Sequence, residues 1–360
     1  MRLRRWNDLR GPYKAEIFSR DYEFRSVAVI REPSLQEDYL TLEGTSVTAP
    51  AILAKKGDYA VITELTGAPV YQGIVSDLSA ENGAVKLKLS PLLSLFDVTV
   101  SYDRTALQTG ALEDFLAGVI RDTYQQNQDS LQNIPGLTVT ATSRTTGTAL
   151  NIKSNVHELW DLASKALTLY GIVIWAALEV QEKRLTVTIG KNDRRLVLES
   201  ELSNCLGKNV VLTDDYGALN KATYLNKDDE SQQVTYYLHT DGSVDTEDRD
   251  RVEPVFFSTE YIEGAEDFAA EAQRRAGEAL TPQIYEQLIE LRYRQDDPMV
   301  TPAALEIGTQ ADILYGGKAY RSILTGYELD SGTITLVFGA VRMELTKKLI
   351  LERRKKNADT

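Results

Sequence analysis

Two stretches of this 360-residue chain, one near each end, share a weak self-similarity. The first, Gly57 to Phe96, reads GDYAVITELTGAPVYQGIVSDLSAENGAVKLKLSPLLSLF, and the second, Gly308 to Leu345, reads GTQADILYGGKAYRSILTGYELDSGTITLVFGAVRMEL. In each, a glycine opens a strand-like run, and two glycine-containing turns separate it from a second and a third run. The separation is far too long for a solenoid, so the pattern predicts two related β-barrels separated by inserted material. Chance similarity between two β-meanders is the alternative.

Six glycines stand at corresponding points of the two stretches and are the structural positions that the repeat singles out. They are Gly57 and Gly308 at the start of the first strand, Gly73 and Gly326 within or after the second, and Gly83 and Gly332 in the turn before the third. Asn82-Gly83 lies between two strand-like runs, and Asn-Gly is a strong hairpin signal because both residues tolerate positive φ. The sequence therefore predicts a β-hairpin around Gly83.

The whole chain is predicted to be an α+β, β-rich protein with two related small β-barrels. Strand-like runs dominate up to residue 100, helical periodicity appears between 101 and 195, and strands return from residue 209. We therefore expect an α+β insert between the barrels and a helix-containing insert in the second barrel. The expected boundaries are 1–100 for the N-terminal β-barrel, 101–195 for the α+β insert domain, 196–255 and 283–346 for the second β-barrel region, 256–282 for the helical insert and 347–360 for a basic C-terminal tail.

Three helices are predicted from apolar residues that recur with a period near 3.6. The first has an apolar stripe from Leu112 to Tyr124 and Thr109 as its N-cap residue. The second follows Asn155 as N-cap and ends at Gly171. The third lies between Gly264 and Leu280 and stops before Pro282. The expected inner face of the third helix is Phe268, Ala269, Ala272, Ala276 and Leu280.

Charge and cysteine content exclude several classes of protein. The chain has 53 acidic and 40 basic residues, so tight nucleic-acid binding, which depends on Lys and Arg, is not expected. Cys205 is the single cysteine, which excludes an internal disulfide and a zinc site built from thiolates. No apolar run reaches membrane-spanning length, and MRLRRWNDLRGPY lacks the apolar core of a signal peptide. We expect cytoplasmic synthesis, no membrane anchor and no export by a cleaved signal.

Motifs that carry chemistry are sparse, and we predict no catalytic residues, no cofactor and no metal. The two histidines, His157 and His239, have no partner that the sequence identifies. No HExxH, Gly-x-Ser-x-Gly, P-loop or dinucleotide pattern occurs. Adjacent carboxylates of the kind used by glycosidases or calcium sites do occur, but 53 acids make such pairs inevitable. The pairs are Asp214/Asp215, Asp228/Asp229 and Asp296/Asp297.

Together these features resemble the central hub proteins of the baseplates of long-tailed bacteriophages, also called tail-associated or prophage tail endopeptidase N-terminal-like proteins. The resemblance spans nearly the whole chain. It is carried by the Gly57-Asp58 strand start with VYQG at 70–73, the run NVHELWDLASKALTLYGIVIW, and the run IGTQADILYGGKAYRSILTGYELDSGTITLVFG. The resemblance implies a homotrimer in which two tandem barrels per chain form a ring of six similar units.

Such a ring implies a structural role in the virion tail. Three chains with two similar surfaces each can meet the six equivalent edges of a tail tube. The implied partners are a tail-tube or distal tail protein, separate tip, spike or fibre proteins, and DNA only as passing cargo in a central channel. An acidic chain fits that channel, because a basic lumen would hold phosphates. The chain ends soon after its second barrel, so we expect no lytic domain and no enzymatic activity.

Three other functions stay open at the level of sequence. One is a tail-tip carbohydrate-binding or adhesion module, because tyrosines stack on sugars, although ordinary sheet composition also explains them. Another is a hydrolase that uses a carboxylate pair. The third is the hub of a contractile injection particle, in which three chains would also have to meet the six equivalent edges of a tube. The tyrosines considered are Tyr236, Tyr237, Tyr315 and Tyr320.

Overall fold

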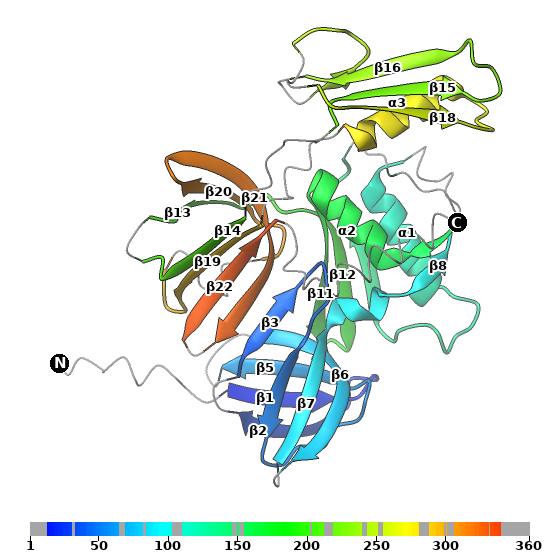
Figure 1. Ribbon diagram of the computed structural model, residues 1–360. Helices are drawn as coiled ribbons and strands as arrows, with labels where there is room; N and C mark the ends of the chain where they lie inside the picture. The colour runs from blue at the N-terminus through cyan, green and yellow to red at the C-terminus, as the bar shows by residue number, and fades with distance from the viewer. Residues whose placement is uncertain are drawn as a thin grey trace.

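The computed structural model describes most of the chain as a β-rich α+β protein. Two half-barrel sheets are joined by a region with helices, and a small sheet with one helix lies at the top of Figure 1. The expected fold class is confirmed. The expected tail at 347–360 lies outside the described part. The described residues are 13–30, 33–64, 69–81, 84–102, 110–145, 150, 155–201, 204–211, 219–239, 243–250, 255–280, 288–298, 300, 306–330 and 332–339.

The first half-barrel has six antiparallel strands in the order β2-β1-β5-β6-β7-β4. Alternation of apolar and polar residues sets its inner face, as in β4, where Thr45, Val47 and Ala49 are buried and the residues between them are exposed. The strands are β1 (Tyr13–Phe18), β2 (Phe24–Ile30), β4 (Thr45–Ala49), β5 (Tyr59–Glu64), β6 (Pro69–Glu81) and β7 (Ala84–Pro91).

The second half-barrel has the strand order β13-β20-β21-β22-β19-β14, in which the β13–β20 pair is parallel and the others are antiparallel. Its strands are β13 (Arg195–Glu199), β14 (Gly207–Val211), β19 (Leu288–Arg294), β20 (Gln310–Tyr315), β21 (Lys318–Asp330) and β22 (Thr333–Phe338).

One strand from the N-terminal region belongs to the second half-barrel. β3 (Leu35–Asp38) pairs antiparallel with β21 at Gly326 to Leu329. This differs from the expectation that residues 1–100 form a barrel of their own. The physical reason is that the end of β21 extends past β20, and its backbone groups there need partners that β3 supplies.

The region between the half-barrels contains a three-stranded sheet, β11-β12-β9, and a two-stranded sheet, β10-β8. The strands are β8 (Thr99–Ser101), β9 (Leu137–Ala141), β10 (Val156–Glu158), β11 (Ile172–Glu179) and β12 (Arg184–Lys191), and the helices are η2 (Leu92–Phe96), α1 (Leu112–Tyr124) and α2 (Leu159–Tyr170).

The first two helices test the helix predictions directly. The apolar stripe predicted for α1 is confirmed, although its N-cap position is Ala111 and the expected N-cap Thr109 lies outside the described residues. The end of α2 at Gly171, which has a left-handed φ of 68°, is also confirmed. The predicted start of α2 after Asn155 is wrong, because residues 156–158 form β10 and pair with β8. Strand pairing with a distant segment therefore takes precedence over a local capping signal.

The described residues between 221 and 279 form a small unit with an apolar core of its own. Its sheet has the order β17-β16-β15-β18, and α3 (Phe268–Ala279) packs on one face through the buried Ala272 and Ala276. Phe268 packs partly against this core, but Ala269, also expected on the inner face, is exposed. The strands are β15 (Lys221–Asn226), β16 (Gln233–Leu238), β17 (Val244–Asp245) and β18 (Phe257–Ile262).

This unit differs from the expected boundaries, which placed residues up to 255 in the second barrel and only 256–282 in an insert. β15 pairs in parallel with β18 and antiparallel with β16, so all four strands share one sheet. None of the four pairs with a described strand of the second half-barrel. The insert between β14 and β19 of the second half-barrel is therefore larger than the helix and its neighbouring strand.

Candidate assembly interface

Each half-barrel contains four strands of its own that follow the same order. The order β5-β6-β7-β4 in the first corresponds to β20-β21-β22-β19 in the second. β6 and β21 each have 13 residues and carry a one-residue bulge, at Ser76 and at Thr325. The bulge hydroxyl makes the same hydrogen bond in both: Ser76 Oγ donates to the Lys88 carbonyl over 3.1 Å, and Thr325 Oγ1 donates to the Val337 carbonyl over 3.2 Å.

The chain enters both modules through the same backbone geometry. Gly57 and Gly308 have φ values of 91° and 88°, which favour glycine. The Gly57 amide donates to the Val75 carbonyl, and the Gly308 amide donates to the Leu324 carbonyl, both over 2.8 Å. Val75 and Leu324 each return a 2.8 Å bond to the residue that follows the glycine. These two glycines occupy equivalent places.

The two strand glycines, in contrast, are not equivalent. By strand register, the counterpart of Gly73 is Ser322. Four residues separate the bounds of β5 and β6, whereas two separate those of β20 and β21, so positions after this connection shift by two relative to the entry glycine. Gly326 has a separate role, because a Cβ there would lie 2.8 Å from the Glu37 carbonyl oxygen of β3. Glycine at this place lets β3 approach β21.

The turn glycines lie at the matching hairpins. Gly332 has a φ of 80° between β21 and β22. Gly83 is outside the described residues, but Glu81 pairs with Ala84 on either side of it, so the predicted hairpin is confirmed. Gly57 and Gly308 are therefore equivalent in structure, and Gly83 and Gly332 correspond by their positions in the chain.

An exposed apolar stripe runs along the outer face of β2, an edge strand of the first half-barrel. Phe24, Val27 and Val29 are 57%, 47% and 51% exposed, and Leu53 beside them is 73% exposed. Phe18 on β1 continues the stripe through an edge-to-face contact with Phe24. We call these five residues the β2 stripe. Apolar residues gathered on an edge strand are typical of a surface that another chain covers.

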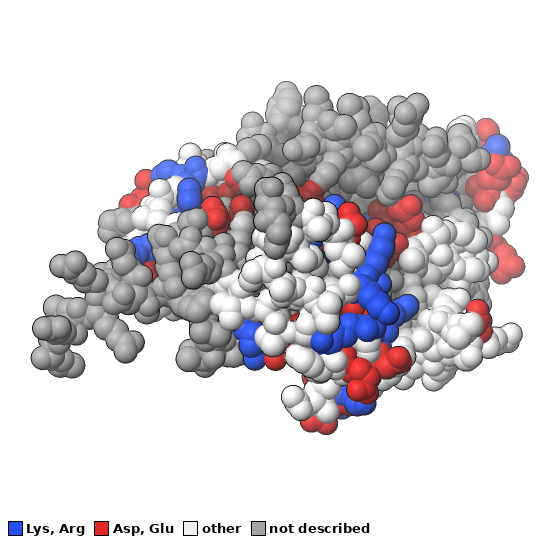
Figure 2. Space-filling model, turned by 90° about the horizontal axis from the view of Figure 1, so that it is seen from below, with Lys and Arg blue, Asp and Glu red and all other residues white. Residues whose placement is uncertain are grey.

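Figure 2 shows the face of the molecule on which the first half-barrel lies in Figure 1. Uncharged side chains occupy much of the described area of this face, and Lys and Arg side chains form a band beside them. The charges on this face are mixed rather than uniformly acidic, since red and blue groups adjoin. This face combines an uncharged area with adjoining charged groups, and a polar rim around a less charged centre is common in protein interfaces.

Tyr39 joins the second half-barrel to the region between the barrels. It is 1% exposed, and its ring centroid lies 4.8 Å from that of Trp160 on α2. Its amide donates to the Thr325 carbonyl over 2.9 Å, its carbonyl accepts from Trp160 Nε1 over 2.8 Å, and its hydroxyl accepts from the Ile174 amide over 3.1 Å. One residue thus bonds to the β21 bulge, to α2 and to β11.

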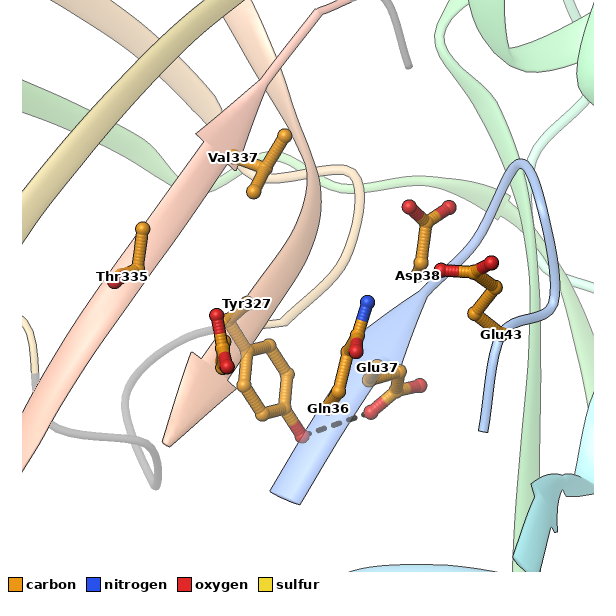
Figure 3. A pocket seen from close by; sticks show the side chains of 8 residues that line it. Gln36, Glu37, Asp38, Glu43, Tyr327, Thr335 and Val337 are labelled. Carbon is orange, nitrogen blue, oxygen red and sulfur yellow. Dashed lines mark hydrogen bonds between the residues drawn. The ribbon is translucent and has the colours of Figure 1, made fainter. Parts of the chain in front are cut away.

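A small cavity lies between β3 and β21 beside this junction (Figure 3). Tyr327 and Glu37 point toward each other there, and the tyrosine hydroxyl donates to Glu37 Oε2 over 2.8 Å. Burial raises the pKa of Glu37, and the bond from Tyr327 offsets only part of this rise. Burial and the nearby Glu37 raise the pKa of Tyr327 well above its ordinary value. The pair adds a side-chain hydrogen bond to the backbone pairing of β3 with β21.

The two histidines have local structural partners. His157 Nε2 lies 3.5 Å from Asp161 Oδ2 at the start of α2. His239 is 2% exposed, and its two ring nitrogens face acceptors: Nε2 lies 2.8 Å from Asp245 Oδ1 and Nδ1 lies 2.6 Å from the Arg249 carbonyl. With both nitrogens acting as donors, the charged imidazolium is favoured, and no ring nitrogen is left to accept a proton.

Stability of the small unit is expected to depend on pH through the His239–Asp245 pair. The bond to Asp245 raises the pKa of His239 above 6.5, so this contribution is complete below about pH 6.5 and is lost as pH rises through the raised pKa. The bond from His239 lowers the pKa of Asp245 to about 2, so its contribution is complete above about pH 3.8 and is lost as pH falls toward 2. Both contributions are present between these limits.

Native-state hydrogen exchange measures this dependence in β16 and β17. The opening free energy of Leu238 and Val244 should be lowered by His239→Gln most strongly near pH 5, and the difference should shrink above pH 8. His157→Gln is the matched control and should leave these amides unchanged at every pH. A His239→Gln effect that is the same from pH 5 to pH 9 would contradict the charged pair.

Where the structure describes them, the carboxylate pairs accept hydrogen bonds from loop residues. Asp229 accepts from Ser231 and Gln232, Asp228 accepts from the Gly264 amide, and Asn204 donates to Asp297. Asp214/Asp215 lie outside the described residues. Within the described part of the chain, no group of three or more His, Cys, Asp or Glu is placed to hold a metal ion, and no helix has the length and apolar character to cross a membrane.

The tyrosines considered for sugar stacking are scattered over the fold. Tyr236 is buried in the small unit, and Tyr237 points from the opposite face of β16 beside Lys221. Tyr315 ends β20 beside Lys208, and Tyr320 packs partly against the main core. The structure therefore does not bring these four residues to one site. The sequence analysis did not identify Tyr39. It is one of 18 tyrosines, and no motif around it distinguishes it from the others.

Comparison with known proteins identifies the fold but no sequence family. No protein-family model matches the chain, and no curated protein matches it. Among solved structures, the 43 kDa tail protein of prophage MuSo2 from Shewanella oneidensis is similar, with a TM-score of 0.55 at 12% identity; 91% of this chain and 98% of that chain are covered.

Two further solved structures have the same fold. The tail protein from Neisseria meningitidis MC58 has a TM-score of 0.52 at 14% identity, covering 91% of this chain and 96% of that chain. The prophage tail protein gp18 from Listeria monocytogenes EGD-e has a TM-score of 0.51 at 10% identity, covering 95% and 98%. The fold of this protein is therefore that of phage tail proteins along nearly its whole length, as the sequence resemblance implied.

Proposed function

We propose that this protein is a structural hub of a phage tail tip. In this proposal it is a homotrimer whose two half-barrels per chain form a pseudo-six-fold ring between a hexameric tail tube and a three-fold tip. The observation that carries the proposal is the match between the two four-stranded modules in strand order, bulge and entry glycine. The shared fold with three phage tail proteins supports it.

The physical argument is symmetry matching. A six-fold tube end offers six equivalent contacts, and a trimer can meet them alike only if each chain presents two similar surfaces. Two modules with the same backbone bonds provide such surfaces even where their side chains differ. The proposed partners are a tail-tube or distal tail protein and separate tip, spike or fibre proteins, with DNA as passing cargo. The proposed location is the tail baseplate of the virion, and the proposed role is assembly rather than catalysis.

The oligomeric state of the full chain tests this proposal. Light scattering coupled to size-exclusion chromatography is expected to give three times the chain mass. Electron cryomicroscopy of the same sample should show six half-barrels alternating around one central pore. A monomer at all concentrations up to about 100 μM, or a trimer whose half-barrels do not surround a common axis, would contradict the hub.

The β2 stripe provides a mutational test of self-association. Val27→Asp combined with Val29→Asp is expected to convert the trimer to a monomer, because two carboxylates would have to be buried without partners in the interface. Both positions are about half exposed in the single chain, so folding should be retained. Sedimentation velocity at a fixed concentration measures the change.

Leu131→Asp is the matched control for the β2 stripe. Leu131 is 91% exposed and lies in the segment between α1 and β9, away from both half-barrels in sequence. This variant should remain trimeric, with a melting temperature equal to that of the unmodified chain. If the stripe variant stays trimeric while folded, the stripe is not a subunit contact.

A further inference from the structure

The second half of β6 presents an open strand edge. Only its first half, up to Ile74, pairs with β5, whereas β7 runs along its other side to the hairpin at Glu81. Among the described strands, none pairs with residues 77–80 on the side that β5 leaves open. Leu78 is 39% exposed, and Asp77, Ser79 and Ala80 are also exposed.

The equivalent edge in the second half-barrel is covered. By register, Leu78 corresponds to Tyr327 and Ala80 to Leu329, because both pairs stand at the same distance from their hairpin turns. β3 pairs with β21 at these very positions, and Leu329 is 3% exposed. Among the described strands, the two modules therefore differ at this edge: β21 has received an added strand, and β6 has not.

The direction of the backbone groups on β6 follows from the ladder. Glu81 and Ala84 close a two-residue turn, where the closing pair exchanges hydrogen bonds, and such pairs alternate with pairs that do not. Ala80 and Leu78 are thus the residues whose amides and carbonyls point away from β7, toward the open side. An edge of this kind is a template for another strand.

We propose that this open half of β6 is the docking edge for a strand from a second copy of this chain. The inference rests on the proposed hub. In a closed ring, the contact from the second half-barrel to the next copy's first half-barrel repeats the contact within one chain, which β3 makes by strand addition to β21. A second copy therefore occupies on β6 the place that β3 occupies on β21.

Hydrogen exchange with mass spectrometry tests the proposal on the full chain. Within residues 77–81, the amides of Leu78 and Ala80 should exchange at least a hundredfold more slowly in the assembled protein than in a sample diluted below its dissociation concentration, because the other amides already face β7. Residues 326–330 are the internal control and should be slow in both samples, because β3 covers them within one chain. The outcome separates this inference from the hub itself.

A trimer in which residues 77–81 still exchange at the monomer rate would overturn the docking edge and leave the hub standing. A chain that remains monomeric would contradict the hub and this inference together. Substitution gives a second measurement: Ala80→Pro removes an amide on the open side and should weaken self-association at least tenfold. Ala80→Val keeps that amide and should assemble normally; equal assembly of the two folded variants would also overturn the proposal.

Discussion

Replacement of Tyr39 by alanine is expected to lower the free energy of unfolding by about 3–5 kcal/mol, as for other large aromatic residues removed from a core. Tyr39 is 1% exposed, and its ring packs against Trp160. The substitution leaves a cavity between β21, α2 and β11, and it leaves the Ile174 amide without the tyrosine hydroxyl that accepts from it. Urea denaturation followed by tryptophan fluorescence measures the loss.

Tyr39→Phe distinguishes the contribution of the ring to stability from that of the hydroxyl. The phenylalanine keeps the contact with Trp160 and loses only the acceptor for the Ile174 amide, so the expected cost is about 1–2 kcal/mol. The backbone bonds of Tyr39 to Thr325 and Trp160 are kept in both variants. If Tyr39→Ala costs no more than Tyr39→Phe, ring packing does not hold the junction together.

Gly308→Ala is expected to destabilise the protein much more than the equivalent change Gly57→Ala. Both positions have φ near 90°, so an alanine at either costs about 1–3 kcal/mol of backbone strain. The space around them differs. A Cβ at Gly57 would meet no atom within 4 Å, but one at Gly308 would lie 2.4 Å from Cγ2 of the buried Val173. Overpacking there adds about 1–3 kcal/mol.

A double-mutant cycle identifies the cause of that difference. Val173→Ala removes the methyl group that clashes, so it should recover part of the stability lost in Gly308→Ala and none of that lost in Gly57→Ala. Chemical denaturation of the two single glycine variants and the two double variants provides the comparison. Equal costs at the two glycines, or no coupling to Val173, would show that the contact with β11 does not constrain Gly308.

Much of the repeat was predictable because its signals are local. Gly57, Gly308 and Gly332 occur where the backbone requires positive φ, and positive φ is a property of one residue and its neighbours. Asn82-Gly83 predicted a hairpin for the same reason, and Glu81 pairs with Ala84 across it. The apolar period of α1 likewise depends only on residues within four positions of one another.

Errors arose where one segment acts on a distant one. Asn155 carries a valid capping signal, but pairing of residues 156–158 with β8 determines the start of α2. Gly73 and Gly326 look alike in sequence, yet by strand register Gly73 corresponds to Ser322 and Gly326 corresponds to Asp77. The boundary expected at residue 256 also failed to anticipate that β15 and β18, more than 30 residues apart, share a sheet.

The amino-acid sequence by itself determined the strands, the turns, the helical stripe of α1 and the presence of two similar modules. These follow from side-chain alternation, positive-φ glycines and apolar periodicity, all of which act within a few residues. The tertiary structure decided that β3 crosses to β21, that Tyr39 joins three elements and that half of the β6 edge is left open. Such features depend on which backbone groups find partners across more than a hundred residues, and no local pattern encodes that choice.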